Sequence, residues 1–156
     1  MKGLASNISA PLLVGALILC VMVGLALFAP WLAPQDPSEI HLEGKLTGPS
    51  RAHLFGMDAL GRDVLSRIIY GARISVLVGF TTVGICFVFG TLMGFLAGYY
   101  GGVLDEAIMR GVDILLAFPG ILLAITLTSI LGPSLRNVIL ALCVMGWVGY
   151  ARIVRA

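Results

Sequence analysis

Charge is the scarcest property of this 156-residue sequence. Only 12% of the residues are charged, 59% are hydrophobic, and the formal net charge is +2. A soluble domain carries about 25% charged residues, so the composition excludes an ordinary soluble domain. The few basic residues alternate with acidic ones and form no cluster of the kind that binds nucleic acid. We therefore expect no nucleic-acid partner.

Motifs for catalysis and metal binding are also missing. Gly44-Lys45 is followed by Leu46, whereas a phosphate-binding Walker loop needs Ser or Thr at that position. His41 and His53 stand alone in a polar segment, without the further ligands that a zinc site needs. We predict that this chain is not an enzyme and that it holds no cofactor and no metal.

Cysteine is scarce as well, with three residues in the chain. Cys20, Cys86 and Cys143 each lie inside a hydrophobic run. An odd number of cysteines at such positions does not indicate a disulfide framework or a metal site. We interpret them as small hydrophobic residues packed between helices.

What the sequence does contain is long uncharged runs, which cover residues 3–35, 74–104, 114–135 and 137–151. A membrane-spanning helix needs about 20 apolar residues. Each run is longer than the roughly 10 residues of a barrel strand, and none alternates apolar with polar residues. Helices also satisfy every backbone polar group within the segment. We predict an all-α, polytopic membrane helix bundle with spans near residues 12–32, 74–97, 112–131 and 138–154.

The first and the fourth uncharged runs differ from the other two. Lys2 before the first run resembles the start of a signal peptide, but the run is too long for one, so we expect an uncleaved span. The fourth run is short, and it spans the bilayer only if Arg136 and Arg152 extend their side chains toward the interfaces.

The only sizeable polar segment covers residues 33–73. It opens with Pro34 and Pro37, which end the first helix. Its last part, residues 60–73, has apolar residues on one helical stripe and an Asp63–Arg67 pair spaced i,i+4 on the other side. We predict a short amphipathic helix at the membrane surface that turns into the second span. A solvated helix in a small extramembrane cap is the alternative. We therefore divide the chain into residues 1–73, which hold the N-terminal span and the polar segment, and residues 74–156, which form the first part of the main transmembrane domain.

Small residues and one proline predict how the spans pack and bend. Gly90, Gly94 and Gly98 recur every fourth residue and would form a smooth face for close contact with another helix. Glycine is frequent in this chain, so chance spacing remains the alternative. Pro119 lacks the N–H that would bond the carbonyl group of Leu115, so we expect a kink, which either lines a pathway or serves packing alone.

Charges near the spans leave two points open. Asp113 lies three residues after Arg110, and we expect a local pair with Arg110 or a contact with the helix N-terminus. Four crossings place both ends of the chain on one side. The count of Lys and Arg leans slightly against a cytoplasmic location of those ends and does not decide the orientation.

Several strings resemble the C-type permease subunit of bacterial dipeptide, oligopeptide and nickel ABC importers. Residues 53–58 (HLFGMD) and 61–67 (GRDVLSR) are similar to that family's H-x-F-G-T-D-x-x-G-R-D-V-x-S-R signature, with Met57 where the family usually has Thr. The resemblance continues through residues 71–75, 97–102, 117–119, 131–133, 137–142 and 150–156. The charged and glycine residues that fall on the signature positions are Gly61, Arg62, Asp63, Arg67, Arg110 and Asp113.

The resemblance implies a multi-pass protein of the bacterial inner membrane that forms part of the translocation pathway for peptides or a related small solute. The implied partners are the lipid bilayer, a homologous second permease subunit, two ABC ATPase subunits and an extracytoplasmic solute-binding protein. It also implies cytoplasmic chain ends and an outer-face location for residues 33–73, near the docking surface of the binding protein. It does not select among dipeptide, oligopeptide and nickel as the substrate.

The family has six spans, and its coupling helix follows the position of Ala156, so the resemblance implies the front part of such a subunit, with four of six spans. A non-transporting, truncated membrane remnant is the alternative function. A small self-assembling channel would need polar residues repeated along one span, and the sequence has no such pattern.

Overall fold

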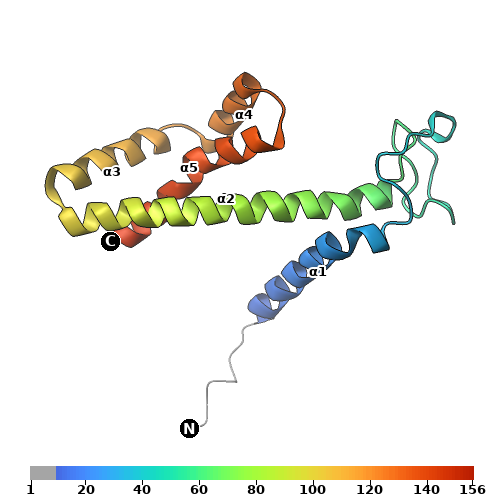
Figure 1. The fold of residues 1–156 in the computed structure, drawn as a ribbon, viewed down its shortest axis with the longest axis horizontal. Coiled ribbons are helices and arrows are strands. Elements are labelled where there is room, and N and C mark those ends of the chain that lie inside the picture. The colour runs from blue at the N-terminus through green and yellow to red at the C-terminus, as the bar shows by residue number, and fades with distance from the viewer. Residues whose placement is uncertain (1–9) are drawn as a thin grey trace, which may run out of the picture. The chain divides into compact units, whose positions relative to one another are not determined.

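The computed structural model describes residues 10–156 (Figure 1). The elements are α1 (Ala10–Leu32), the short 3-10 helix η1 (Leu42–Gly44), α2 (Val64–Tyr100), α3 (Gly102–Leu116), α4 (Gly120–Leu131) and α5 (Leu135–Arg155). Within this described range the only β-type pairing is an isolated bridge between Met57 and Asp63. The predicted all-α fold is therefore confirmed. Lys2 lies outside the described residues.

Helix length and composition fit several crossings of a membrane. In the described residues, α1, α2 and α5 are each long and apolar enough to span, and α3 with α4 adds a fourth span if the bent pair counts as one. The predicted spans at residues 12–32 and 138–154 lie inside α1 and α5. Most large apolar side chains on these helices are exposed, as expected for surfaces that face lipid or other helices.

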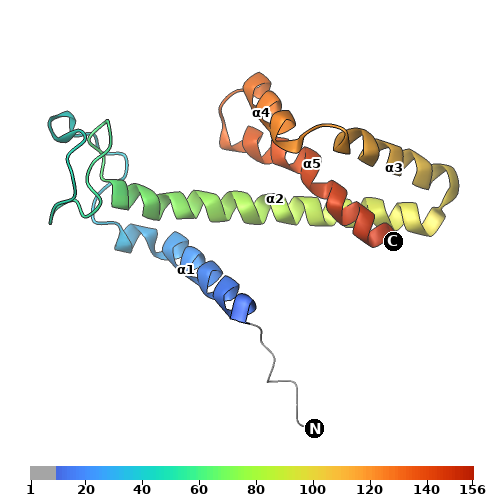
Figure 2. The same ribbon diagram turned by 180° about the vertical axis from the view of Figure 1, so that it is seen from behind.

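Helix α2 differs from the prediction for residues 60–73. No separate surface helix turns into the second span, because α2 runs without a break for 37 residues from Val64 (Figure 2). At 1.5 Å per residue it is about 55 Å long, which exceeds the roughly 30 Å hydrocarbon core of a bilayer. Its first turns, which carry Arg67 and Arg73, therefore project beyond the apolar part of the same helix.

The predicted third span is broken rather than gently kinked. Helices α3 and α4 meet at an angle of 85°. Pro119 is the N-cap residue of α4, with extended backbone angles. The ring of Pro119 cannot continue the helix of the preceding residues, and the residue before a proline disfavours helical angles. Residues 117–119 therefore form a corner between two short helices.

Glycines form the turn between α2 and α3, and side-chain hydrogen bonds cap the junction between α4 and α5. The turn from α2 to α3 uses Gly101 and Gly102, whose φ angles of 60° and 55° suit glycine. Ser134 caps α5 by accepting a hydrogen bond from the Asn137 N–H group at 3.2 Å. The side-chain amide of Asn137 also donates a hydrogen bond to the Leu131 carbonyl oxygen at 2.7 Å, which satisfies an otherwise unpaired acceptor at the end of α4.

Contacts between residues divide the chain into two compact units that meet between Leu77 and Val78, inside α2. The first contains α1, the polar segment and the first turns of α2. The second contains the rest of α2 with α3, α4 and α5.

Candidate functional site

The first unit contains a hydrogen-bonded structure of residues 33–67, which we call the polar cap. Asp63 begins α2 as its N-cap residue, because its Oδ2 atom accepts a hydrogen bond from the Ser66 N–H group at 2.8 Å. Its Oδ1 atom lies 3.1 Å from His53 Nδ1. Burial alone would raise the pKa of Asp63, but hydrogen bonds from Ser66 and His53 outweigh it and hold that pKa below its ordinary value.

The predicted Asp63–Arg67 pair is wrong. Asp63 is 2% exposed and points into the polar cap, where it caps the helix, whereas Arg67 pairs with Asp58. The i,i+4 spacing could not reveal this, because an aspartate at the N-cap turns its carboxylate toward the backbone N–H groups of its own helix. His53, treated as isolated in the sequence, is in fact the partner of Asp63.

Asp58 is the most heavily bonded acid in the polar cap. Its Oδ1 atom accepts hydrogen bonds from the backbone N–H groups of Leu60 at 2.8 Å and Arg62 at 3.0 Å. Its Oδ2 atom accepts from Arg62 Nε at 2.9 Å and also pairs with Arg67. The hydrogen bond from the Arg62 backbone is the largest cause that lowers the pKa of Asp58, with the Arg62 side chain adding to it.

Two glycines let separate loop segments of the polar cap approach one another. Gly61 has a φ of 72°, and a β-carbon there would collide with the carbonyl group of His41. Gly56 has a φ of 74°, and a β-carbon there would lie 2.5 Å from the Thr47 carbonyl oxygen. Both positions need glycine for the backbone angle and for space. The signature residues Gly61, Arg62, Asp63 and Arg67 thus meet around the start of α2.

In the second unit, α2 and α5 meet at their backbones. A β-carbon on Gly90 would collide with the Trp147 carbonyl group, and one on Gly94 would lie 2.5 Å from the Ala151 carbonyl oxygen. Gly98 is less crowded, since its β-carbon would lie 3.4 Å from the Arg155 oxygen. The three glycines therefore share one face, which we call the glycine groove, and α5 lies along it.

Aromatic and thiol groups flank the glycine groove. Phe89 and Trp147 make an edge-to-face contact with ring centroids 5.1 Å apart. The Cys86 thiol lies 3.9 Å from the Cys143 carbonyl oxygen, and Cys86 is 2% exposed. Cys86 and Cys143 are therefore neighbours across the contact between α2 and α5.

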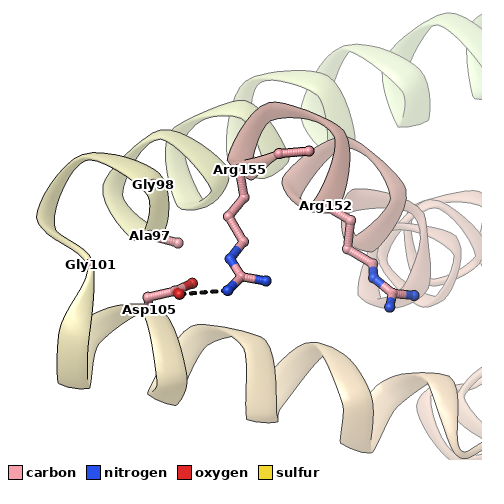
Figure 3. A pocket seen from close by; sticks show the side chains of 7 residues that line it. Ala97, Gly98, Gly101, Asp105, Arg152 and Arg155 are labelled. Carbon is pink, nitrogen blue, oxygen red and sulfur yellow. Dashed lines mark hydrogen bonds and ion pairs between the residues drawn. The ribbon is translucent and has the colours of Figure 1, made fainter.

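An ion pair joins the start of α3 to the end of α5 (Figure 3). Arg155 Nη2 lies 2.6 Å from Asp105 Oδ2, and the pair borders an open cavity of about 420 Å³. Arg152, one turn earlier on α5, lines the same cavity together with Ala97 and Gly101. This contact could not be predicted from the sequence, because 50 positions separate the two partners.

The remaining predicted residues lie apart from these sites. Arg110 pairs with Glu106 on α3 at 2.6 Å rather than with Asp113, so the expected Arg110–Asp113 pair is wrong. Asp113 is exposed on α3, beyond the first turn of that helix, and Pro119 lies at the corner before α4. The Glu106–Arg110 spacing of four residues has the acid first, which is the more favourable order on a helix.

Several long apolar helices, a glycine-mediated helix contact and a polar cap before the longest helix define a multi-span helical membrane protein. Comparison with known proteins makes the class specific. Residues 90–156 match the family model of the binding-protein-dependent transport system inner membrane component. Residues 11–49 match the model of the N-terminal transmembrane domain of oligopeptide transport permease C.

Curated relatives support the same family. A dipeptide transport system permease protein DppC of Alkalihalophilus pseudofirmus is 45% identical over 144 residues, which cover 92% of this chain and 47% of the relative. The DppC protein of Haemophilus influenzae is 45% identical over 150 residues, covering 92% and 51%. A glutathione transport system permease protein GsiD of Pectobacterium atrosepticum is 43% identical over 140 residues, covering 89% and 46%.

The chain therefore belongs to the family of binding-protein-dependent transport system inner membrane components, among the C-type permeases, and it is a transmembrane protein of the bacterial inner membrane. It spans about half the length of the curated relatives it matches. The glycine groove and the Asp105–Arg155 pair both lie within the range of the inner membrane component model.

Proposed function

We propose that this chain forms part of the transmembrane pathway of an ABC importer for peptides or a related small solute. The carrying observation is the family match across residues 90–156, together with relatives at 45% identity that are named as dipeptide permeases. The bent pair α3–α4 adds physical support, since broken helices in transporters line cavities where irregular backbone can be hydrated.

In this proposal the chain carries no catalytic group, and ATP hydrolysis belongs to two ATPase subunits. A second, homologous permease would complete the pathway, and an extracytoplasmic binding protein would deliver the solute. The polar cap would then lie on the outer face, where residues 33–63 offer a hydrated surface to that binding protein. ATP binding would shift the permease between two accessible states only through contacts that differ between them.

The test is purification of the tagged chain, expressed from its own locus, followed by reconstitution in proteoliposomes with the subunits that copurify. We expect one further permease and two ATPases to copurify. We also expect ATP-dependent accumulation of a labelled dipeptide when binding protein is added. Glutathione and Ni²⁺ serve as competing solutes, and a non-hydrolysable ATP analogue serves as the control.

Two outcomes would contradict the proposal. If no ATPase copurifies under conditions in which the helices remain folded, the chain does not belong to a working importer. If the subunits assemble but the vesicles accumulate none of the three solutes, the alternative of a non-transporting membrane protein is favoured.

A further inference from the structure

Asp105 uses only one of its two carboxylate oxygens. Oδ2 bonds Arg155 at 2.6 Å, whereas Oδ1 has less than 1 Å² of exposed surface and no hydrogen-bond partner among residues 10–156. A buried carboxylate oxygen without a partner is costly, and each such group needs an explanation. Here a second cation lies nearby, because Arg152 lines the same cavity and makes no ion pair within the described range.

Arg152 and Arg155 lie three residues apart on α5, so they occupy successive turns on neighbouring positions of one helix face. Figure 3 shows Arg155 reaching toward Asp105, while Arg152 extends from the preceding turn. Movement of α5 by a step of four residues, about 6 Å along its axis, would carry Arg152 to the level of Ala156, one residue beyond the level that Arg155 now occupies.

The glycine groove permits such a movement. Contacts pair Gly90 with Trp147, Gly94 with Ala151 and Gly98 with Arg155, in steps of four residues on both helices. If α5 slid by one turn along α2 in the direction of its own C-terminus, Trp147 would lie at Gly94 and Ala151 would lie at Gly98. The same backbone-to-backbone contact would then repeat at Gly94 and Gly98. The Cys86 thiol, which lies 2.6 Å from where a β-carbon at position 146 would be, would meet Leu142 and must turn aside. One-turn shifts of this kind are a known mode of switching between packed states.

We propose that Asp105 is a two-position latch, which holds α5 through Arg155 in this structure and through Arg152 after a one-turn slide along the glycine groove. Asp105 is a positioning residue in this scheme. The latch rests on the proposed function only for its use, since two registers of α5 would serve the alternation between two accessible states. Its existence can be tested without ATP, substrate or partners.

Native thiols report the register. Cys86 faces Cys143 in this structure, and a slide of one turn would bring residue 139 to that position. Two reporters therefore follow, both in a Cys20→Ala background: the native Cys86–Cys143 pair, and Cys86 with Ile139→Cys and Cys143→Ala. Disulfide formation with copper–phenanthroline as oxidant is measured in nanodiscs, from the mobility of the full chain on non-reducing gels.

Two matched variants decide the question, because each removes one positive charge from the same helix face. Arg155→Gln leaves Arg152 as the only partner, so the residue 143 reporter should fall and the residue 139 reporter should rise, each about threefold, as fits a partly exposed ion pair. Arg152→Gln should leave the 143 reporter high and the 139 reporter low. Asp105→Asn should remove the difference between the two arginine variants.

The proposal is overturned if Arg155→Gln and Arg152→Gln change both reporters in the same direction and to the same extent, because a general loss of packing would do that. It is equally overturned if the residue 139 reporter stays at background in all variants while the residue 143 reporter forms normally, because α5 then has one register. Neither result would affect the transport test above, which measures solute accumulation.

Discussion

Gly94 on α2 faces the carbonyl group of Ala151 on α5 so closely that a β-carbon at position 94 would lie 2.5 Å from the Ala151 oxygen. In a membrane, where lipid competes equally for apolar surface, such close approach is the main source of attraction between helices. The contact between α2 and α5 should therefore depend on the absence of one methyl group.

Gly94→Ala should lower the free energy of unfolding by about 1–3 kcal/mol, the usual cost of inserting a carbon into a packed contact. The matched control is Gly84→Ala on the same helix, where a β-carbon would meet nothing within 4 Å. The control should be neutral or stabilising by up to about 1 kcal/mol, because alanine is the better helix former. Unfolding of the solubilised protein by SDS, followed by circular dichroism, measures both. Equal effects of the two variants would show that α5 does not pack on the glycine groove.

The polar cap should be equally sensitive to an added side chain at Gly61, where φ is 72° and the His41 carbonyl group leaves no space for a β-carbon. Gly61→Ala combines a left-handed backbone that costs roughly 1–2 kcal/mol with a steric clash. We expect faster trypsin cleavage of the polar cap at Lys45 and Arg51. Gly48→Ala, where nothing lies within 4 Å, is the control and should be cleaved at the wild-type rate. Wild-type cleavage of both variants would mean that the polar cap is not folded as described.

Asp58 links stability to pH. Its pKa is held below the ordinary value of 3.8, first by the hydrogen bond from the Arg62 backbone. A depressed folded pKa contributes stability that is fully present above 3.8 and is lost as the pH falls through the folded value. Asp58→Asn should therefore lower the thermal unfolding temperature at pH 7, and the difference from wild type should narrow below pH 3.8. A difference that is constant from pH 7 to pH 3 would contradict this account.

Much of the fold could be predicted from elementary rules, because uncharged apolar runs of about 20 residues indicate membrane-spanning helices. The end of α1 follows from the positions of Pro34 and Pro37, and the helical fold follows from the long uncharged runs. The continuity of α2 could not be predicted, because an amphipathic stretch before a span has the same sequence pattern whether the helix bends there or continues straight. Pro119 predicts a kink, but the angle of 85° depends on which carbonyl groups find other partners.

The sites show the same limit. The four-residue spacing of Gly90, Gly94 and Gly98 indicates a common face, but nothing in it names α5 as the helix that lies there. Local spacing predicts Arg67 as the partner of Asp63, whereas the partners in the polar cap are Ser66 and His53, which lies ten residues away. The Asp105–Arg155 contact joins residues 50 apart, and only the packing of α5 against α2 brings them together.

The most direct measurement of the central claim is the sidedness of α2. Ala52 precedes this helix and is exposed, and Val103 follows it and is 85% exposed. Ala52→Cys and Val103→Cys, each in a Cys20→Ala background, are treated with an impermeant thiol reagent in right-side-out and inverted inner-membrane vesicles. Crossing by α2 predicts labelling of the Ala52→Cys variant only in right-side-out vesicles and of the Val103→Cys variant only in inverted ones. Labelling of both variants from the same side would contradict a membrane-spanning α2 and, with it, the assignment of this chain as a permease component.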